Sequence, residues 1–216
     1  MQTNKTSANK RIENFPIKNK RGSILKKIAI AGNIASGKTQ VENYLVSKGF
    51  SVFDSDKISH DLLNEAKIKQ EITEYFPSTN INNKIDRKLL GNIVFNDQQK
   101  RISLERIIHP QIEIKIKEIF KSSKENIVFI SLPLLFETGF DKLFDEIIFV
   151  SADENLRLER LMRRNNLNET EAKKRIKSQL SEDFKKEKSN YIINNNGSIE
   201  DLHSQVDVII SKIVAD

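Results

Sequence analysis

The chain has 216 residues, of which 38% are hydrophobic and 31% charged, a composition that suits one compact domain with an inserted subdomain. It contains no cysteine, which excludes disulfides, iron–sulfur clusters, cysteine-ligated zinc and thiol nucleophiles. The longest nearly apolar run, residues 127–136, is well short of the roughly 20 residues of a membrane-spanning helix, so we expect no membrane partner.

The net charge of +6 comes from one end of the chain. Residues 1–27 carry eight basic side chains and one acidic side chain, whereas the other 189 residues carry 28 basic and 29 acidic side chains. A basic protein suggests a nucleic-acid partner, but here the basicity belongs to a leader of residues 1–25. The leader lacks the apolar stretch of a secretory signal, and its lysines and asparagines outnumber its arginines, unlike a transit peptide. We expect a poorly ordered overhang on a cytoplasmic monomer, with no nucleic-acid partner.

The first half of the chain predicts a strand, a loop, a helix and a second strand, followed by a helical region. Residues 26–31 have the apolar character of a buried parallel strand. Residues 41–48 predict a helix closed by Gly49, and residues 50–53 predict the second strand. Helical spacing follows over residues 57–75, then a polar turn over 78–83 and a largely helical region over 87–119 that we expect to break at His109-Pro110.

The second half continues the alternation. It predicts strands at residues 127–132, 146–150 and 191–193, and helices at residues 154–164, from 168 to about 188, and from 198 onward. Strands alternating with helices predict a three-layer α/β fold with a parallel, five-stranded sheet.

The segment after the first predicted strand fits the phosphate-loop pattern G-x-x-x-x-G-K-[ST]. Glycines let the backbone wrap around phosphate oxygens, and backbone N–H groups with the following helix N-terminus attract the anion. Lys38 adds a point charge, and the Thr39 hydroxyl can bind Mg²⁺. We therefore expect these residues to bind a nucleotide: Gly32, Asn33, Ile34, Ala35, Ser36, Gly37, Lys38, Thr39 and Gln40.

Two other classes of phosphate-loop protein fit less well. Residues 83–86 spell Asn-Lys-x-Asp, the guanine-binding string of GTPases, but they follow a polar turn instead of a late buried strand, and no Asp-x-x-Gly occurs. A motor or AAA-type ATPase would end its third strand in an acidic residue, and residues 127–133 contain none. The sequence favours a small kinase.

Two carboxylates follow the second predicted strand. If that strand extends to Asp56, its period of two puts Asp54 and Asp56 on one face near the carboxyl end of the sheet, where open α/β sheets bind ligands. A carboxylate there can accept the proton of an attacking hydroxyl or help to hold Mg²⁺. Asp54 suits a helix cap equally well, so Asp56 is the better candidate for the base.

Several motifs in the same order resemble the dephospho-coenzyme A kinase family. Residues 52–56 are similar to the family's Val-Ile-Asp-Ala-Asp, and residues 85–95 to its Leu-Asp-Arg-x-x-Leu-Gly followed by Val-Phe. Residues 107–110 match Ile-x-His-Pro, and residues 132–137 match Val-Pro-Leu-Leu-Phe-Glu. Later positions also follow the family pattern: Arg160 to Arg164, Gln179 and residues 193–195. The resemblance runs from residue 28 to about residue 197.

The resemblance implies transfer of the γ-phosphoryl group of ATP to the ribose 3′-hydroxyl of dephospho-coenzyme A, the last step of coenzyme A biosynthesis, with ATP and Mg²⁺ as cofactors. It implies a P-loop kinase core over residues 26–216, a helical acceptor-binding subdomain at about 57–120 and a helical lid at about 154–188. It assigns catalysis to Asp56, Lys38, Arg160 and Arg164. The implied substrate contacts are Asp54, Asp56, His109, Leu134, Phe136 and Glu137, although His109 and Phe136 also suit structural roles.

Charge spacing gives the lid independent support. Arginines three or four residues apart on the helix predicted over 154–164 can share a face and offset charge on transferring oxygens. They are Arg157, Arg160, Arg163 and Arg164. The alternative is an ordinary solvated basic face.

The chain departs from the family pattern at Asn33, Ala35, Gln40, Glu182 and Ser189-Asn190. Ala35 requires a φ that an L-residue tolerates. Two other functions stay open: a nucleoside, nucleotide or other metabolite kinase with the same core, and a nucleic-acid-associated ATP-binding protein that uses the leader.

Overall fold

The computed structural model describes residues 25–215, so the predicted leader lies outside the described residues except for Leu25. Its centre is a five-stranded sheet in the order β2-β5-β1-β6-β7, with every neighbouring pair parallel, which confirms the predicted architecture. The strands are β1 (Lys26–Gly32), β2 (Val52–Asp54), β5 (Ile127–Ser131), β6 (Glu146–Ser151) and β7 (Tyr191–Asn194).

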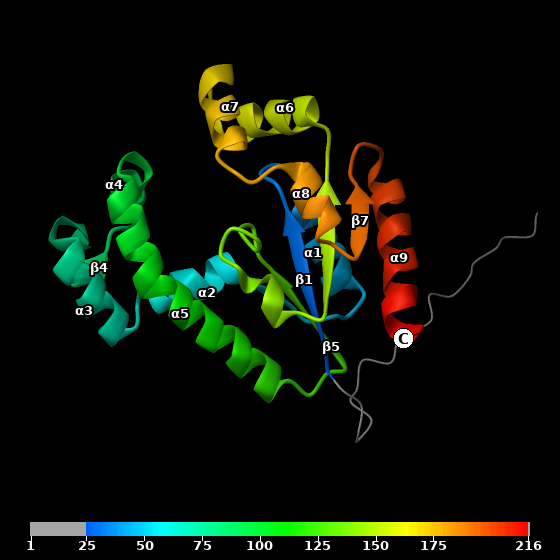
Figure 1. Ribbon diagram of the computed structural model, residues 1–216, viewed down its shortest axis with the longest axis horizontal. Helices are drawn as coiled ribbons and strands as arrows, with labels where there is room; N and C mark the ends of the chain where they lie inside the picture. The colour runs from blue at the N-terminus through cyan, green and yellow to red at the C-terminus, as the bar shows by residue number, and fades with distance from the viewer. Residues whose placement is uncertain (1–24, 216) are drawn as a thin grey trace, which may run out of the picture.

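Alternation along β1 separates the two hydrophobic cores. Ile28 and Ile30 point to the face covered by α1 (Lys38–Ser47) and α9 (Ile199–Ala215). Ala29 and Ala31 point to the opposite face, where α5 (Gln98–Ser122) and the other helices between β2 and β5 pack. Figure 1 shows α9 on one side of the sheet and the helices between β2 and β5 on the other.

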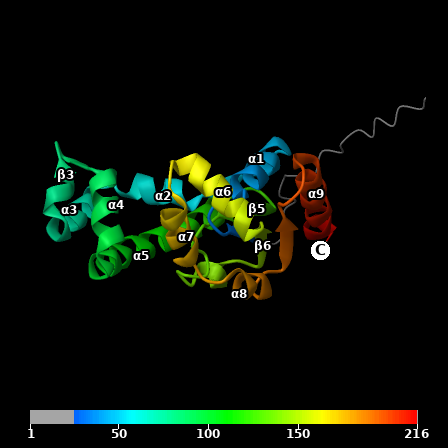
Figure 2. The ribbon, with the colours of Figure 1, turned by 90° about the horizontal axis from the view of Figure 1, so that it is seen from above.

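The helical block between β2 and β5 extends to one side of the sheet (Figures 1 and 2). It contains α2 (Ser55–Leu62), α3 (Ala66–Tyr75), the 3₁₀ turn η1 (Pro77–Thr79), the antiparallel pair β3 (Asn80–Ile81) and β4 (Lys84–Ile85), α4 (Arg87–Asn96) and α5 (Gln98–Ser122).

A second group of helices lies near the carboxyl ends of the strands (Figure 1). After the 3₁₀ turn η2 (Phe140–Leu143) and β6, it comprises α6 (Glu154–Asn165), α7 (Glu169–Lys177) and α8 (Glu182–Glu187). Helices α6 and α7 share a small core of their own, formed by Leu161, Ala172 and Ile176. Among the described residues, none of the helices combines the length and apolar character needed to cross a bilayer.

The structure corrects the prediction for Asp54 and Asp56. Strand β2 ends at Asp54, whose carboxylate accepts the Asp56 N–H at 2.8 Å and caps α2. Asp56 therefore lies in the first turn of a helix, and the two carboxylates do not share a strand face. The capping interpretation of Asp54 is confirmed.

The predicted helix breaks need correction as well. Residues 57–75 form two helices, α2 and α3, instead of one. Helix α5 continues through Pro110, and the break falls at Asp97, whose carboxylate caps α5 by accepting the N–H groups of Gln99 and Lys100. A strong cap fixes where a helix begins, whereas proline removes only one N–H donor from a helix held by packing.

Two smaller predictions need correction. Of the polar turn region predicted over residues 78–83, Asn82 and Asn83, with φ of 50° and 62°, form the turn of the hairpin, but residues 80–81 belong to its strand β3. The helix that Asn168 caps, with the expected box to Glu171, ends at Lys177, and a new helix starts after the cap Ser181.

Candidate active site

The phosphate loop connects β1 to α1 and is closely surrounded. A Cβ at Gly32 would lie 2.9 Å from the Val150 carbonyl oxygen, and one at Gly37, where φ is +91°, would lie 1.9 Å from the Asn195 side chain. Glycine is therefore required at both positions. Ala35 occupies the left-handed region at φ 61°, a conformation that costs an L-residue roughly 1 kcal/mol or more. Ala35 therefore has a φ that an L-residue tolerates, as expected, but only with strain.

Side chains from distant segments hold the loop from outside. The Ile34 N–H donates to Gln179 Oε1 at 2.7 Å, and Asn195 Nδ2 donates to the Ser36 carbonyl oxygen at 2.7 Å. Buried polar atoms without a protein partner gather around the same loop: Asn33 Oδ1, Ser36 Oγ and Arg160 Nη1. The Ser36 hydroxyl and the Arg160 guanidinium can donate to phosphate oxygens, so the loop suits a phosphate group, whereas Asn33 Oδ1 is an acceptor and needs a donor.

Lys38 is already paired in this structure. Its Nζ lies 2.6 Å from Glu42 Oε1, and the Ser131 hydroxyl contacts both groups. Sequence reasoning missed Glu42 and Ser131. Two signals could have found them: the four-residue spacing from Lys38 to Glu42 on one helix, and a polar residue that ends the buried strand β5.

The residues after Lys38 are open to solvent. Thr39 and Gln40 are exposed in the first turn of α1. Between residues 25 and 215, no three His, Cys, Asp or Glu side chains are grouped so that they could hold a metal ion. The oxygen donors present, Thr39 with Asp54 and Asp56, fit Mg²⁺, which keeps several waters and takes many of its ligands from substrate phosphates.

Asp56 lines a cavity of about 280 Å³ between the sheet and the helical block. Burial among the cavity walls raises the pKa of the Asp56 carboxyl, the charge of Asp54 raises it further, and Lys38 lowers it in part. The side chain nevertheless stays accessible from the open side of the cavity. Asp56 is therefore a stronger base than an ordinary aspartate, and it lies within electrostatic reach of the phosphate loop.

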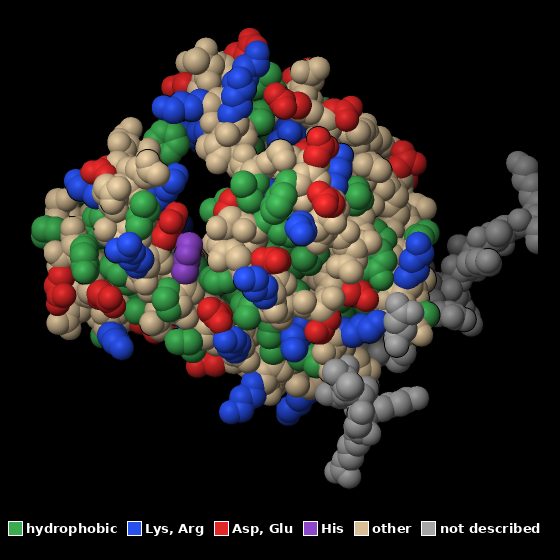
Figure 3. Space-filling model, viewed as in Figure 1, with side chains coloured by type: hydrophobic (Ala, Val, Ile, Leu, Met, Phe, Trp, Pro, Cys, Tyr) green, Lys and Arg blue, Asp and Glu red, His purple; other side chains and the backbone are tan. Residues whose placement is uncertain are grey.

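The cavity is assembled from α2, α4, α5 and the segment after β5, and Figure 3 shows the surface hollowed beside the helical block. Two of the predicted substrate contacts, His109 and Leu134, line this cavity. The His109 ring packs edge-on against the Phe140 ring, with 5.8 Å between the ring centroids. Burial lowers the pKa of the His109 imidazole. The cavity therefore presents a neutral imidazole and mostly apolar walls.

Phe136 and Glu137 do not line the cavity. Phe136 contacts Phe184 edge-on at 6.2 Å. Glu137 Oε1 pairs with Lys185 Nζ at 2.6 Å and accepts the Leu180 N–H at 3.2 Å. Lys185 is only 1% exposed, so a charged partner is essential to it.

The four arginines of α6 have different environments. Arg160 reaches the phosphate loop: its Nη1 lies 3.8 Å from the position of a Cβ at Gly37, and its Nη2 donates to the Asn195 carbonyl oxygen at 3.2 Å. Arg157 is buried, whereas Arg163 and Arg164 are exposed, and Arg164 donates to Asn165. Of these four arginines, Arg160 is therefore the one that lies against the phosphate loop in this structure.

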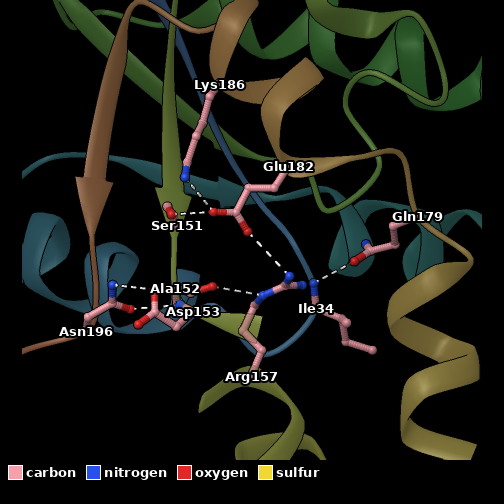
Figure 4. A network of polar contacts seen from close by, with 9 residues as sticks. All are labelled: Ile34, Ser151, Ala152, Asp153, Arg157, Gln179, Glu182, Lys186 and Asn196. Carbon is pink, nitrogen blue, oxygen red and sulfur yellow. Dashed lines mark hydrogen bonds and ion pairs between the residues drawn. The ribbon is translucent and has the colours of Figure 1, made fainter. Parts of the chain in front are cut away.

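Glu182 joins α6, α8 and β6 in a single network (Figure 4). Its carboxylate lies 3.4 Å from Arg157 Nη2 and 2.9 Å from Lys186 Nζ, and it accepts the Ser151 hydroxyl. Burial alone would raise the pKa of the Glu182 carboxyl, but the hydrogen bonds and nearby cations outweigh it and lower the pKa. This network is a reason for an acid at Glu182, where the sequence departs from the family pattern.

Comparison with known proteins identifies the family. The family description "Dephospho-CoA kinase" matches residues 26–201. A dephospho-CoA kinase of Fusobacterium nucleatum is 39% identical over 83% of this chain and 94% of its own length. The solved dephospho-CoA kinase from Campylobacter jejuni is 31% identical, with a TM-score of 0.67 over 89% of this chain and 98% of its own.

A more distant likeness concerns the fold alone. Shikimate kinase from Acinetobacter baumannii has a TM-score of 0.53 at 17% identity, over 89% of this chain and 95% of its own. The nearer matches extend over nearly the whole described chain, including the phosphate loop and the cavity. The chain therefore belongs to the dephospho-CoA kinase family.

Proposed function

We propose that the chain transfers the γ-phosphoryl group of ATP to the ribose 3′-hydroxyl of dephospho-CoA, giving CoA and ADP, the last step of coenzyme A biosynthesis. The observation that carries the proposal is the position of Asp56, which lines the acceptor cavity and lies within electrostatic reach of Lys38. A hydroxyl group bound beside Asp56 would face the phosphate loop.

In the proposed step, the hydroxyl oxygen attacks the γ-phosphorus and its proton passes to Asp56 as the bond to the β-phosphate oxygen breaks. Lys38 and Arg160 offset the charge on the phosphate oxygens. Lys38 shifts from Glu42 toward the phosphates, since a lysine ammonium on its flexible stem can exchange partners. Bound Mg²⁺ would supply further charge neutralisation, and the Thr39 hydroxyl would hold it. Arg164 is exposed here and would act only after a movement of α6.

The remaining contacts divide between two substrates. We assign ATP to residues 32–40 and the acceptor to the cavity that includes His109 and Leu134. Asp54 acts by capping the helix that carries Asp56. Phe136 and Glu137 would act on the acceptor only indirectly, through the segment after β5. Residues 57–120 would be the acceptor-binding subdomain of a cytoplasmic monomer, and residues 154–188 would be its lid.

An acceptor panel tests the proposal. ADP release would be followed with ATP and Mg²⁺ in the presence of dephospho-CoA, AMP, UMP, shikimate or uridine. The proposal expects turnover with dephospho-CoA and addition of one phosphoryl group to that molecule by mass spectrometry. Turnover of another acceptor alone would replace the proposal with a different metabolite kinase.

A further inference from the structure

The connector between α7 and α8, residues 178–181, is hydrogen-bonded to the phosphate loop and to the segment after β5. The side chain of Gln179 accepts the Ile34 N–H of the phosphate loop at 2.7 Å. The next residue, Leu180, donates its N–H to Glu137, three residues after Leu134 of the acceptor cavity. Two adjacent residues therefore bond to the phosphate loop and to Glu137, which lies between the cavity residues Leu134 and Thr138 in the chain.

The tie to Ile34 fixes a strained part of the loop. The following residue, Ala35, adopts φ 61°, which an alanine keeps only when its surroundings impose it. The side chains of Ile34 and Ala35 also pack against the small core of α6 and α7, around Leu161. The loop and these two helices are thus joined by one hydrogen bond and one shared apolar contact.

Helix α8, on the other side of the connector, is anchored to the body of the protein. Its buried Lys185 is paired with Glu137, and its Glu182 is bonded to Ser151 at the end of β6. Figure 4 shows the bond between Glu182 and Ser151 beside the bond between Gln179 and Ile34. The pair α6–α7, which has a separate core, therefore meets the anchored helix α8 at two places: the connector itself and the ion pair of Arg157 with Glu182.

We propose that Gln179 is a positioning residue that couples the phosphate loop to α6 and α7, so that ATP in the loop brings these helices, with Arg160, over the phosphates. The inference rests on the proposed function only where it says that this movement favours phosphoryl transfer. The coupling itself is a property of nucleotide binding. Gln179 suits this role because its carboxamide oxygen accepts a loop N–H that would otherwise be unpaired.

A matched tie elsewhere in the molecule provides the control. Asn190 Oδ1 accepts the Ile147 N–H at 2.9 Å, near the amino end of β6. Gln179→Leu and Asn190→Leu each remove a carboxamide oxygen that accepts one backbone N–H. A purely structural role for Gln179 predicts the same outcome for both variants: a small loss of stability and an unchanged response to nucleotide.

The experiment measures amide hydrogen exchange of residues 154–177 with and without a non-hydrolysable ATP analogue, together with calorimetric affinities for the analogue and ADP. We expect the analogue to slow exchange in the unmodified chain and in Asn190→Leu, but not in Gln179→Leu. The analogue should bind Gln179→Leu about three- to tenfold more weakly, the range of one lost hydrogen bond, with ADP affinity changed less than twofold.

The coupling would be overturned if the analogue slowed exchange in Gln179→Leu as much as in the unmodified chain. It would also be overturned if the analogue did not change exchange in the unmodified chain. Neither readout involves an acceptor. A failure of dephospho-CoA in the acceptor panel would therefore overturn the proposed function and leave the coupling intact.

Discussion

The phosphate loop and the acceptor cavity are built in opposite ways. The loop is nine consecutive residues, with its conformation set by two glycines and by side chains that bond its backbone from outside. The cavity is assembled from α2, α4, α5 and the segment after β5, which come from widely separated parts of the chain. A contiguous motif that uses backbone groups is readable from a sequence, whereas an assembled cavity depends on packing. Asp56 lies where the two regions meet.

Removal of the loop's charge should strongly reduce catalysis. Lys38→Met should lower kcat by about 10²- to 10³-fold, because it removes a positive charge that offsets the charge on the transferring phosphoryl group. A coupled ADP-release assay would measure the loss. Lys48→Met is the control, since Lys48 directly follows α1 but pairs with Asp207 of α9. Equal losses in both variants would contradict the role of Lys38.

Loss of the Glu182 carboxylate should lower the free energy of unfolding by about 3 kcal/mol, because Glu182→Leu leaves the buried Arg157 guanidinium without its ion partner. Denaturant unfolding would measure the change. The double variant Arg157→Leu/Glu182→Leu should recover most of it, since no uncompensated charge stays buried. A single variant as stable as the unmodified chain would show that the network contributes nothing.

The activity should depend on pH through Asp56. The base must be ionised, so kcat/KM should fall about tenfold for each pH unit below the pKa of Asp56. Burial and Asp54 raise that pKa, so the loss should begin at a higher pH than for an ordinary aspartate. Asp54→Asn should move the midpoint down by removing one like charge, while an asparagine still caps α2. A midpoint that does not move would contradict the electrostatic contact.

A smaller effect is expected where the two helical groups meet. The Phe95 ring of α4 is 61% exposed and lies 5.8 Å from Lys174 Nζ and 5.9 Å from Arg175 Cζ of α7. Phe95→Ala should remove about 0.5–1 kcal/mol of cation–π interaction between α4 and α7. Because the two helices are then held together less tightly and exclude water less, acceptor-independent ATP hydrolysis should rise roughly two- to fivefold. Tyr75→Ala, an exposed aromatic of α3, is the control. Unchanged hydrolysis would show that this contact does not exclude water.

The strength of the sequence prediction follows the same division. The five parallel strands and the phosphate loop follow from apolar runs and a contiguous motif. The break at Asp97 and the continuation through Pro110 did not, because packing decides where a proline is tolerated. The pairing of Glu137 with Lys185 joins residues 48 positions apart, and no local pattern reports it. The proposed role of Asp56 came from its position after the second strand and from the family resemblance, and its place on a helix required the structure.

The most direct test of the account is the Asp56→Asn variant, assayed for phosphoryl transfer to dephospho-CoA and for ATP affinity. The account predicts that transfer falls by about 10²- to 10⁴-fold, the contribution of a general base. It also predicts that the Kd for ATP changes less than twofold and that stability at neutral pH does not fall, because ionisation of a carboxyl with a raised pKa disfavours the folded state. Asp61→Asn, on the exposed side of the same helix, should keep full activity. Transfer by Asp56→Asn at the unmodified rate, or a loss of ATP binding as large as the loss of transfer, would contradict the account.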